Sequence, residues 1–125
     1  MVYAIGLDLV EIERIRTAHR RYGDRFMTRL FSADEIKIIE NKGAIAIESM
    51  AGRFAAKEAV LKALGVFFKK GVYLHNIEIL NHPGGMPYVR LPDKLNRKLK
   101  NRKLLISITH ERKFAAATAI ISDED

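Results

Sequence analysis

Bulky and small residues alternate along the start of the chain. Residues 2–9 place large apolar side chains at every second position: Tyr3, Ile5, Leu7 and Leu9. Successive side chains of a strand point to opposite faces, so the alternation predicts a β-strand. We expect the bulky face to pack on the core. Asp8 then falls on the small-residue face, where a ligand or a backbone can approach closely.

Later segments change to a helical period or carry helix boundaries. The predicted helices are residues 11–21, 32–42, 46–64 and 93–100. The second begins at Ser32, and Glu35 three residues later completes a capping box. The third is rich in Ala, Glu, Lys and Leu, and it ends at Gly65. Its apolar stripe is expected to face the core and comprises Ala56, Val60, Ala63, Leu64 and Phe67.

The second half of the chain is richer in strand patterns. The predicted strands are residues 76–80, 87–91, 104–109 and 114–121. Turn residues at 82–85 and 110–113 join them into hairpins. Helices together with hairpin-linked strands indicate an α+β fold. A chain of 125 residues suits one domain, so we expect residues 1–125 to form it.

Composition narrows the class of protein. The chain has no cysteine, which excludes disulfides and thiolate chemistry. No apolar run reaches the length of a bilayer span, and the N-terminus lacks a basic leader, so a cytoplasmic protein without a membrane partner is expected. Lys and Arg number 22 against 15 acids, which gives a formal charge of +7. That excess predicts a polyanionic partner.

Two carboxylates stand out against this basic background. Asp8 ends an apolar run, and Glu58 lies in a helix among Arg53, Lys57 and Lys62. Mg²⁺ is often held by one or two carboxylates plus substrate phosphates, so the pair is a candidate metal site. The three cations are candidate phosphate contacts. The alternative is that Glu58 pairs with Lys62 on a solvated face and that Asp8 caps the next helix.

Two further features carry candidate chemistry. His110 follows a predicted strand, where it serves either as a ligand contact or base or as an ordinary turn residue. Arginines crowd the segment from Arg14 to Arg29, next to Phe26. Such a surface suits an acidic helix with an apolar seam, and equally a nucleic-acid backbone. A non-enzymatic nucleic-acid-binding module is therefore the competing hypothesis.

Four motifs, taken in order, resemble those of the holo-[acyl-carrier-protein] synthases, a group of 4′-phosphopantetheinyl transferases. They are residues 5–15, residues 52–65, residues 76–79 with 85–87, and residues 107–110 with 115–117. The resemblance implies transfer of the phosphopantetheine arm of coenzyme A to a serine of apo acyl carrier protein, with release of adenosine 3′,5′-bisphosphate. It implies no nucleic-acid partner. It further implies a phosphopantetheinyl transferase fold, an antiparallel sheet packed against a long helix, and a homotrimer with sites between subunits.

The resemblance also implies residue roles. Asp8 and Glu58 bind Mg²⁺, and with His110 they form the catalytic set. The expected coenzyme A contacts are Arg53, Lys57, Lys62, Gly65, Pro87, Ser107 and His110. The expected contacts of the acidic carrier protein are Arg14, Arg21, Arg25, Phe26 and Arg29. The serine proton has three candidate acceptors: a metal-ordered water, His110 or a carboxylate.

Two positions depart from the family pattern. Residues 66–71 read Val-Phe-Phe-Lys-Lys-Gly where the family continues with small residues. Met86 stands where a lysine is frequent. We expect one basic contact to be lost there or replaced by Lys69 or Lys70.

Overall fold

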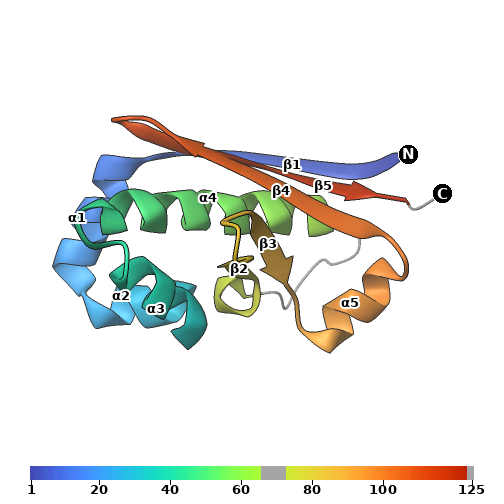
Figure 1. Cartoon of the computed structure of the whole chain (residues 1–125), viewed down its shortest axis with the longest axis horizontal. Coiled ribbons are helices and arrows are strands. Elements are labelled where there is room, and N and C mark those ends of the chain that lie inside the picture. The colour runs from blue at the N-terminus through green and yellow to red at the C-terminus, as the bar shows by residue number, and fades with distance from the viewer. Residues whose placement is uncertain (66–72, 124–125) are drawn as a thin grey trace.

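A long central helix organises the molecule (Figure 1). The structure is a computed structural model that describes residues 1–65 and 73–123. Its elements are β1 (Val2–Glu11), α1 (Ile12–Tyr22), α2 (Asp24–Leu30), α3 (Ala33–Glu40), η1 (Gly43–Ile45), α4 (Ala46–Leu64), η2 (Leu74–Asn76), β2 (Glu78–Asn81), β3 (Pro87–Arg90), α5 (Asp93–Leu99), β4 (Lys103–His110) and β5 (Phe114–Ser122). The sheet of β1, β5 and β4 covers one side of α4, and the other elements lie along its opposite side or at its ends.

The strands form two antiparallel sheets. The larger has the order β1-β5-β4, with Asp8 opposite Ala117 and Ser107 opposite Thr118. The smaller is the β2-β3 hairpin. Met1 and Asp123 lie side by side, because the Asp123 N–H donates to the Met1 carbonyl at 2.8 Å. The predicted α+β fold, an antiparallel sheet packed against a long helix, is confirmed.

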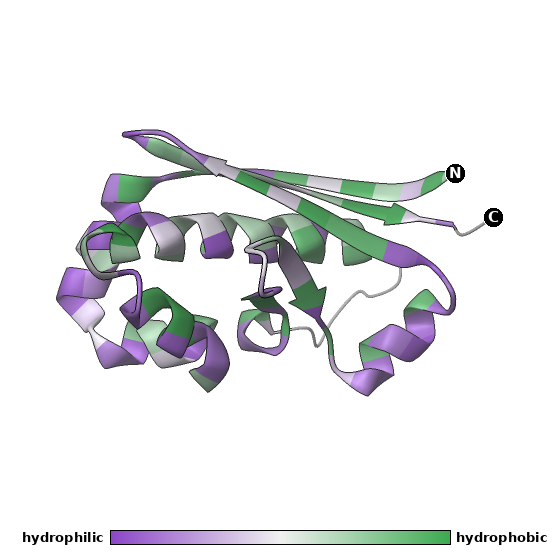
Figure 2. Ribbon diagram, in the orientation of Figure 1, coloured by the Kyte–Doolittle hydropathy of each residue, from purple (hydrophilic) through white to green (hydrophobic). Residues whose placement is uncertain are grey.

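Helix α4 is almost entirely enclosed. Two apolar clusters surround it, one toward the sheet, β2 and α5, the other toward α1, α2 and α3. Ala56, Val60, Ala63 and Leu64 of the predicted stripe are buried, whereas Phe67 lies outside the described residues. Figure 2 shows apolar positions on the strands as well as on the helix. Within residues 1–65 and 73–123, no helix has the length and apolar character needed to cross a membrane.

Strand β1 is confirmed, but the prediction of its inward face is wrong. The bulky residues Tyr3, Ile5, Leu7 and Leu9 are 46–64% exposed, while the small-residue face packs on α4. The reason is a very close helix–strand contact. A Cβ added to Gly6 would lie 1.9 Å from the Ala59 carbonyl oxygen, so only glycine fits there. The inward face therefore carries Asp8 toward the helix.

Two other predictions need correction. Helix α2 was missed, because residues 24–30 make a short segment whose apolar positions are interrupted by arginines. Gly23 separates it from α1 with φ 55°, a conformation that favours glycine. Residues 76–77, predicted as strand, lie instead at and just after the end of η2, and β2 begins at Glu78.

Candidate active site

Asp8 and Glu58 come from different elements and lie close enough for their charges to interact. Asp8 projects from the inward face of β1, with its side chain 17% exposed, and Glu58 is half-buried on α4. Burial and the negative charge of Asp8 raise the pKa of Glu58, while Lys62 opposes that rise. The structure thus brings together the two carboxylates that were predicted to act together.

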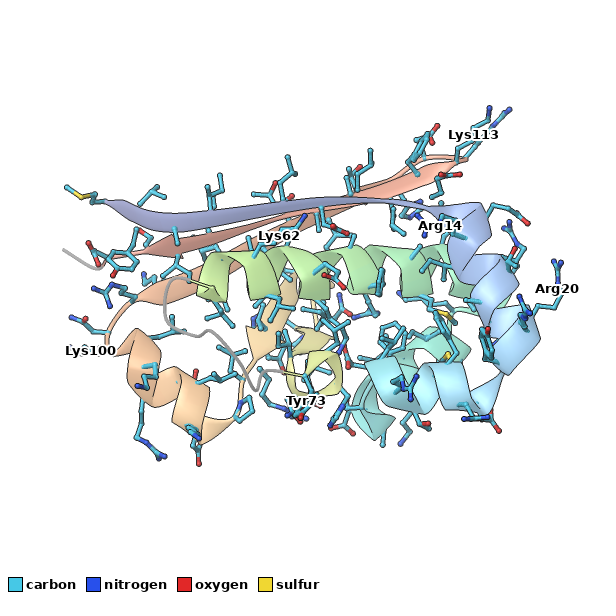
Figure 3. The ribbon with its side chains drawn as sticks, turned by 180° about the vertical axis from the view of Figure 1, so that it is seen from behind. Arg14, Arg20, Lys62, Tyr73, Lys100 and Lys113 are labelled. Atoms are coloured by element: carbon cyan, nitrogen blue, oxygen red, sulfur yellow. The ribbon has the colours of Figure 1, made fainter. Side chains whose placement is uncertain are left out.

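Lys62 supplies the countercharge of this pair. Its ammonium donates to Asp8 Oδ1 at 3.1 Å and to the Leu7 carbonyl at 2.8 Å, and its side chain is 55% exposed (Figure 3). The ion pair therefore joins the helix to β1. Asp8 does not cap α1, since Glu11 occupies the N-cap position.

The residues present fit a magnesium ion. Asp8 and Glu58 provide hard oxygen ligands whose mutual repulsion a cation would relieve. In the described part of the chain, no three His, Cys, Asp or Glu residues gather into a metal-binding group. A two-carboxylate site suits Mg²⁺, which keeps waters and takes further ligands from substrate phosphates.

A cavity of about 210 Å³ contains three other predicted residues, Arg53, Pro87 and His110. Arg53 is 5% exposed and donates to Ser49 Oγ, to the Ile79 carbonyl and to Asn81 Oδ1. Asn81 in turn donates to the Gly85 carbonyl at 2.8 Å, which fixes the β2-β3 turn. Arg53 therefore shapes the cavity wall by holding that turn against α4.

Asn81, which links Arg53 to the turn, was not predicted as a functional residue. Its place just before the turn at 82–85 was the available signal. Met86 on this turn is 70% exposed.

Lys57 is placed differently from its prediction as a ligand contact. Its side chain is fully buried, and its ammonium donates to Glu35 Oε1 (2.6 Å), the Leu74 carbonyl (2.8 Å) and the Ile77 carbonyl (2.5 Å). Three bonds use all the donors of an ammonium, so none is left for a phosphate. Lys57 therefore stabilises the packing of α4 against α3 and against η2 with its C-cap residue Ile77.

Glu35 is the second important residue whose full role was missed. The predicted capping box is confirmed, since Glu35 and Ser32 exchange side-chain and backbone hydrogen bonds. Glu35 also accepts from Lys57 and from the Ile79 N–H at 2.9 Å. Burial raises the pKa of Glu35 and lowers that of Lys57, and their ion pair opposes both shifts.

The remaining predicted coenzyme A contacts lie at separate positions. Gly65 caps the end of α4, and Ser107 is exposed on β4, opposite Thr118. Residues 66–71, including Lys69 and Lys70, lie outside the described residues.

The predicted carrier contacts gather on α1 and α2. Arg14 and Arg21 line one hollow, and Arg25, Phe26 and Arg29 line another. Ala18 and Tyr22 line both, so the two hollows form one continuous surface. Arg21 also lies over the Tyr22 ring, 5.6 Å from its centroid.

Comparison with known proteins gives consistent matches. The model of the 4′-phosphopantetheinyl transferase superfamily matches residues 4–119. The holo-[acyl-carrier-protein] synthase of Protochlamydia amoebophila is 44% identical over 98% of this chain and 99% of that protein. The Bacillus anthracis holo-(acyl-carrier-protein) synthase, solved in complex with CoA (3′,5′-ADP), is 32% identical, with a TM-score of 0.81 over 99% of each chain. The Helicobacter pylori enzyme, solved with coenzyme A, is 35% identical, with a TM-score of 0.80 over 94% of this chain and 99% of that one.

Proposed function

We propose that this chain, which belongs to the 4′-phosphopantetheinyl transferase superfamily, is a holo-[acyl-carrier-protein] synthase. The enzyme transfers the 4′-phosphopantetheine group of coenzyme A to a serine of apo acyl carrier protein. The observation that carries the proposal is the meeting of Asp8 and Glu58 beside Lys62, within a fold shared with relatives solved in complex with coenzyme A.

The chemistry is a displacement at phosphorus. The serine oxygen bonds to the phosphorus that carries pantetheine, the bond from that phosphorus to the bridging oxygen breaks, and adenosine 3′,5′-bisphosphate leaves. The serine proton passes to a base. Lys62 is exposed beside Asp8, where its ammonium orients the pyrophosphate. Asp8 and Glu58 would hold Mg²⁺, which when bound neutralises the pyrophosphate and the charge developing on the leaving oxygen.

The cavity beside Arg53, Pro87 and His110 takes the adenosine bisphosphate end of coenzyme A. His110 is exposed at the end of β4, and the lining also includes the cations Lys42 and Arg53 and the acid Glu48, so the balance of charge favours an anionic ligand. Gly65 and Ser107 contact the remainder of the ligand. The arginine surface of α1 and α2 receives the acidic carrier.

The proposal includes a homotrimer with sites between subunits. Its support is the outer face of the β1-β5-β4 sheet, where Ile5, Leu7, Leu9 and Leu105 are 54–64% exposed. Contiguous apolar residues on a sheet face mark an interface. Sedimentation of the wild type should give three times the chain mass. The Leu7→Asp variant should shift the measured mass toward that of a single chain. A monomeric wild type would remove the trimer from the proposal, together with the placement of sites between subunits, whereas the transferase activity is tested separately by mass measurement.

The proposal includes a cytoplasmic location, with which a chain that has no cysteine for disulfides is compatible.

The direct experiment is a mass measurement. The protein is mixed with coenzyme A, Mg²⁺ and several apo carrier proteins, and each carrier is weighed. A gain of one phosphopantetheine that disappears with a chelator supports the proposal, and no gain on any carrier overturns it. A filter-binding salt titration tests the competing nucleic-acid-binding module, since tight binding with a steep salt slope would favour it.

A further inference from the structure

The ammonium of Lys62 lies against oxygen atoms of the kind that a metal ion takes as ligands. It donates to a carboxylate oxygen of Asp8 at 3.1 Å and to the backbone carbonyl of Leu7 at 2.8 Å. Carboxylate and carbonyl oxygens also suit Mg²⁺ and Mn²⁺. Figure 3 shows Lys62 between α4 and β1. A cation of the protein itself therefore occupies one of the two carboxylates of the proposed metal site.

The second carboxylate acts on the same cation. Glu58 precedes Lys62 by four residues on α4, so the two side chains lie on one face of the helix. Burial and the charge of Asp8 raise the pKa of Glu58, and the charge of Lys62 opposes that rise. The ammonium and both carboxylates thus interact within one small cluster. The negative field that would attract a divalent ion is the field that holds Lys62 in place.

The side chain of Lys62 can leave this position. It is 55% exposed, whereas that of Asp8 is 17% exposed. Within residues 1–65 and 73–123 the ammonium has two acceptors, so one of its three donors remains for a ligand. A lysine side chain has a flexible four-carbon stem, so its ammonium can move while Asp8 stays on β1. A divalent ion at Asp8 would repel that ammonium, and a pyrophosphate would attract it.

We infer that Lys62 competes with the divalent ion for Asp8, and that it transfers to the pyrophosphate of coenzyme A when the metal binds. Without coenzyme A, Lys62 has to give up Asp8 and gains no new partner, which weakens metal binding. With coenzyme A present, the displaced ammonium gains a phosphate partner, so metal and coenzyme A strengthen each other's binding. This inference goes beyond the proposed function and rests on its metal site.

The test measures metal binding without turnover. Mn²⁺ is titrated into wild type and Lys62→Met, first alone and then with saturating coenzyme A and no carrier, and free Mn²⁺ is followed by its paramagnetic resonance signal. We expect Lys62→Met to bind Mn²⁺ alone about fivefold more tightly than wild type, near the upper limit for an exposed ion pair. The factor by which coenzyme A strengthens Mn²⁺ binding should fall by a similar amount, because no ammonium is left to transfer.

Two matched variants serve as controls. Lys62→Arg keeps the positive charge and should retain the wild-type affinity for Mn²⁺ within about twofold. Lys37→Met removes an exposed positive charge from α3, which lies across α4 from the β1-β5-β4 sheet (Figure 1), and should change neither measurement.

Two results would overturn the inference. One is that Lys62→Met binds Mn²⁺ alone no more tightly than wild type, which would leave Lys62 as a phosphate contact only. The other is that Lys37→Met strengthens Mn²⁺ binding as much as Lys62→Met, which would assign the effect to net charge. Neither measurement involves the carrier. A wild-type protein that binds Mn²⁺ and coenzyme A but leaves every carrier unmodified would instead refute the proposed function.

Discussion

Two lysines on one helix, Lys57 and Lys62, stand in opposite electrostatic environments. Lys57 is fully buried and has three protein acceptors, one of them Glu35. Lys62 is half-exposed, and its ion-pair partner Asp8 stands beside a second carboxylate, Glu58. The buried pair is complete without a ligand. The exposed cluster contains one cation for two carboxylates, so its negative charge is only partly balanced. A metal ion, together with the phosphate that it binds, would complete the balance.

The comparison shows why residue type alone does not assign function. Both lysines lie near carboxylates, and both were predicted to contact phosphates. What separates them is the number of partners that the rest of the fold supplies. A buried charge must be fully paired, whereas a charge at an open site can be left for a ligand.

The variant Glu58→Gln tests the exposed cluster most directly. We expect turnover to fall roughly a thousandfold or more, because metal stabilisation of transition-state charge is worth several kcal/mol. The free energy of unfolding should change by less than about 1 kcal/mol, since a half-buried like-charged neighbour is removed. Transferase assays and urea titrations of the same preparation check both. Full activity would remove Glu58 from the metal site.

The matching change in the interior is Lys57→Met. It should lower the free energy of unfolding by about 3–5 kcal/mol, because it leaves the Glu35 carboxylate buried and without its cation. Lys62→Met removes the same group at the exposed site and should cost less than about 1 kcal/mol. Urea unfolding of both variants gives the comparison directly. Equal losses would contradict the division of roles between the two lysines.

A double variant refines this result. Glu35→Gln combined with Lys57→Met removes both charges, so we expect it to recover part of the stability lost by Lys57→Met alone. A loss equal to the sum of the single losses would mean that the two side chains act independently.

The smallest effect concerns the edge of the buried pair, where Glu78 accepts from Arg90 and Ser32. The hydrogen bond from Arg90 holds the pKa of Glu78 below its usual value of 4.5. The folded pKa is lower than the unfolded one, so the stabilisation is present above pH 4.5 and is lost as the pH falls below it.

Glu78→Gln should therefore flatten the acid side of the stability curve and leave its slope near neutral pH unchanged. Urea titrations of the variant and of the wild type from pH 3 to pH 7 measure this difference in slope. An unchanged acid slope in Glu78→Gln would show that Arg90 does not stabilise the folded carboxylate.

The features that could be predicted are those that depend on residues close together along the chain. The capping box at Ser32 and Glu35 and the bounds of α4 follow from neighbouring residues, and the structure confirms them. Asp8 and Glu58 could be singled out because Asp8 ends an apolar run and Glu58 lies among basic residues. Their approach to one another is a property of the fold, in which the negative charge of Asp8 helps to raise the pKa of Glu58.

The parts that failed depend on distant partners. Alternation in β1 gave the two faces but not which one is buried, because that choice is made by the small residues of α4. The role of Lys57 depends on carbonyls of residues 74 and 77, far along the chain. Helix α2 is short, and its packing through Met27, rather than its own pattern, defines it.

The contact of Gly6 with Ala59 also restricts how this protein can evolve. Any side chain at position 6 would collide with the helix backbone, and the strand would have to lift away from α4. Asp8 lies two residues along the same strand, so lifting would carry it away from Glu58. We therefore expect no other amino acid to be tolerated at position 6, and a saturation library screened for transferase activity should return glycine alone.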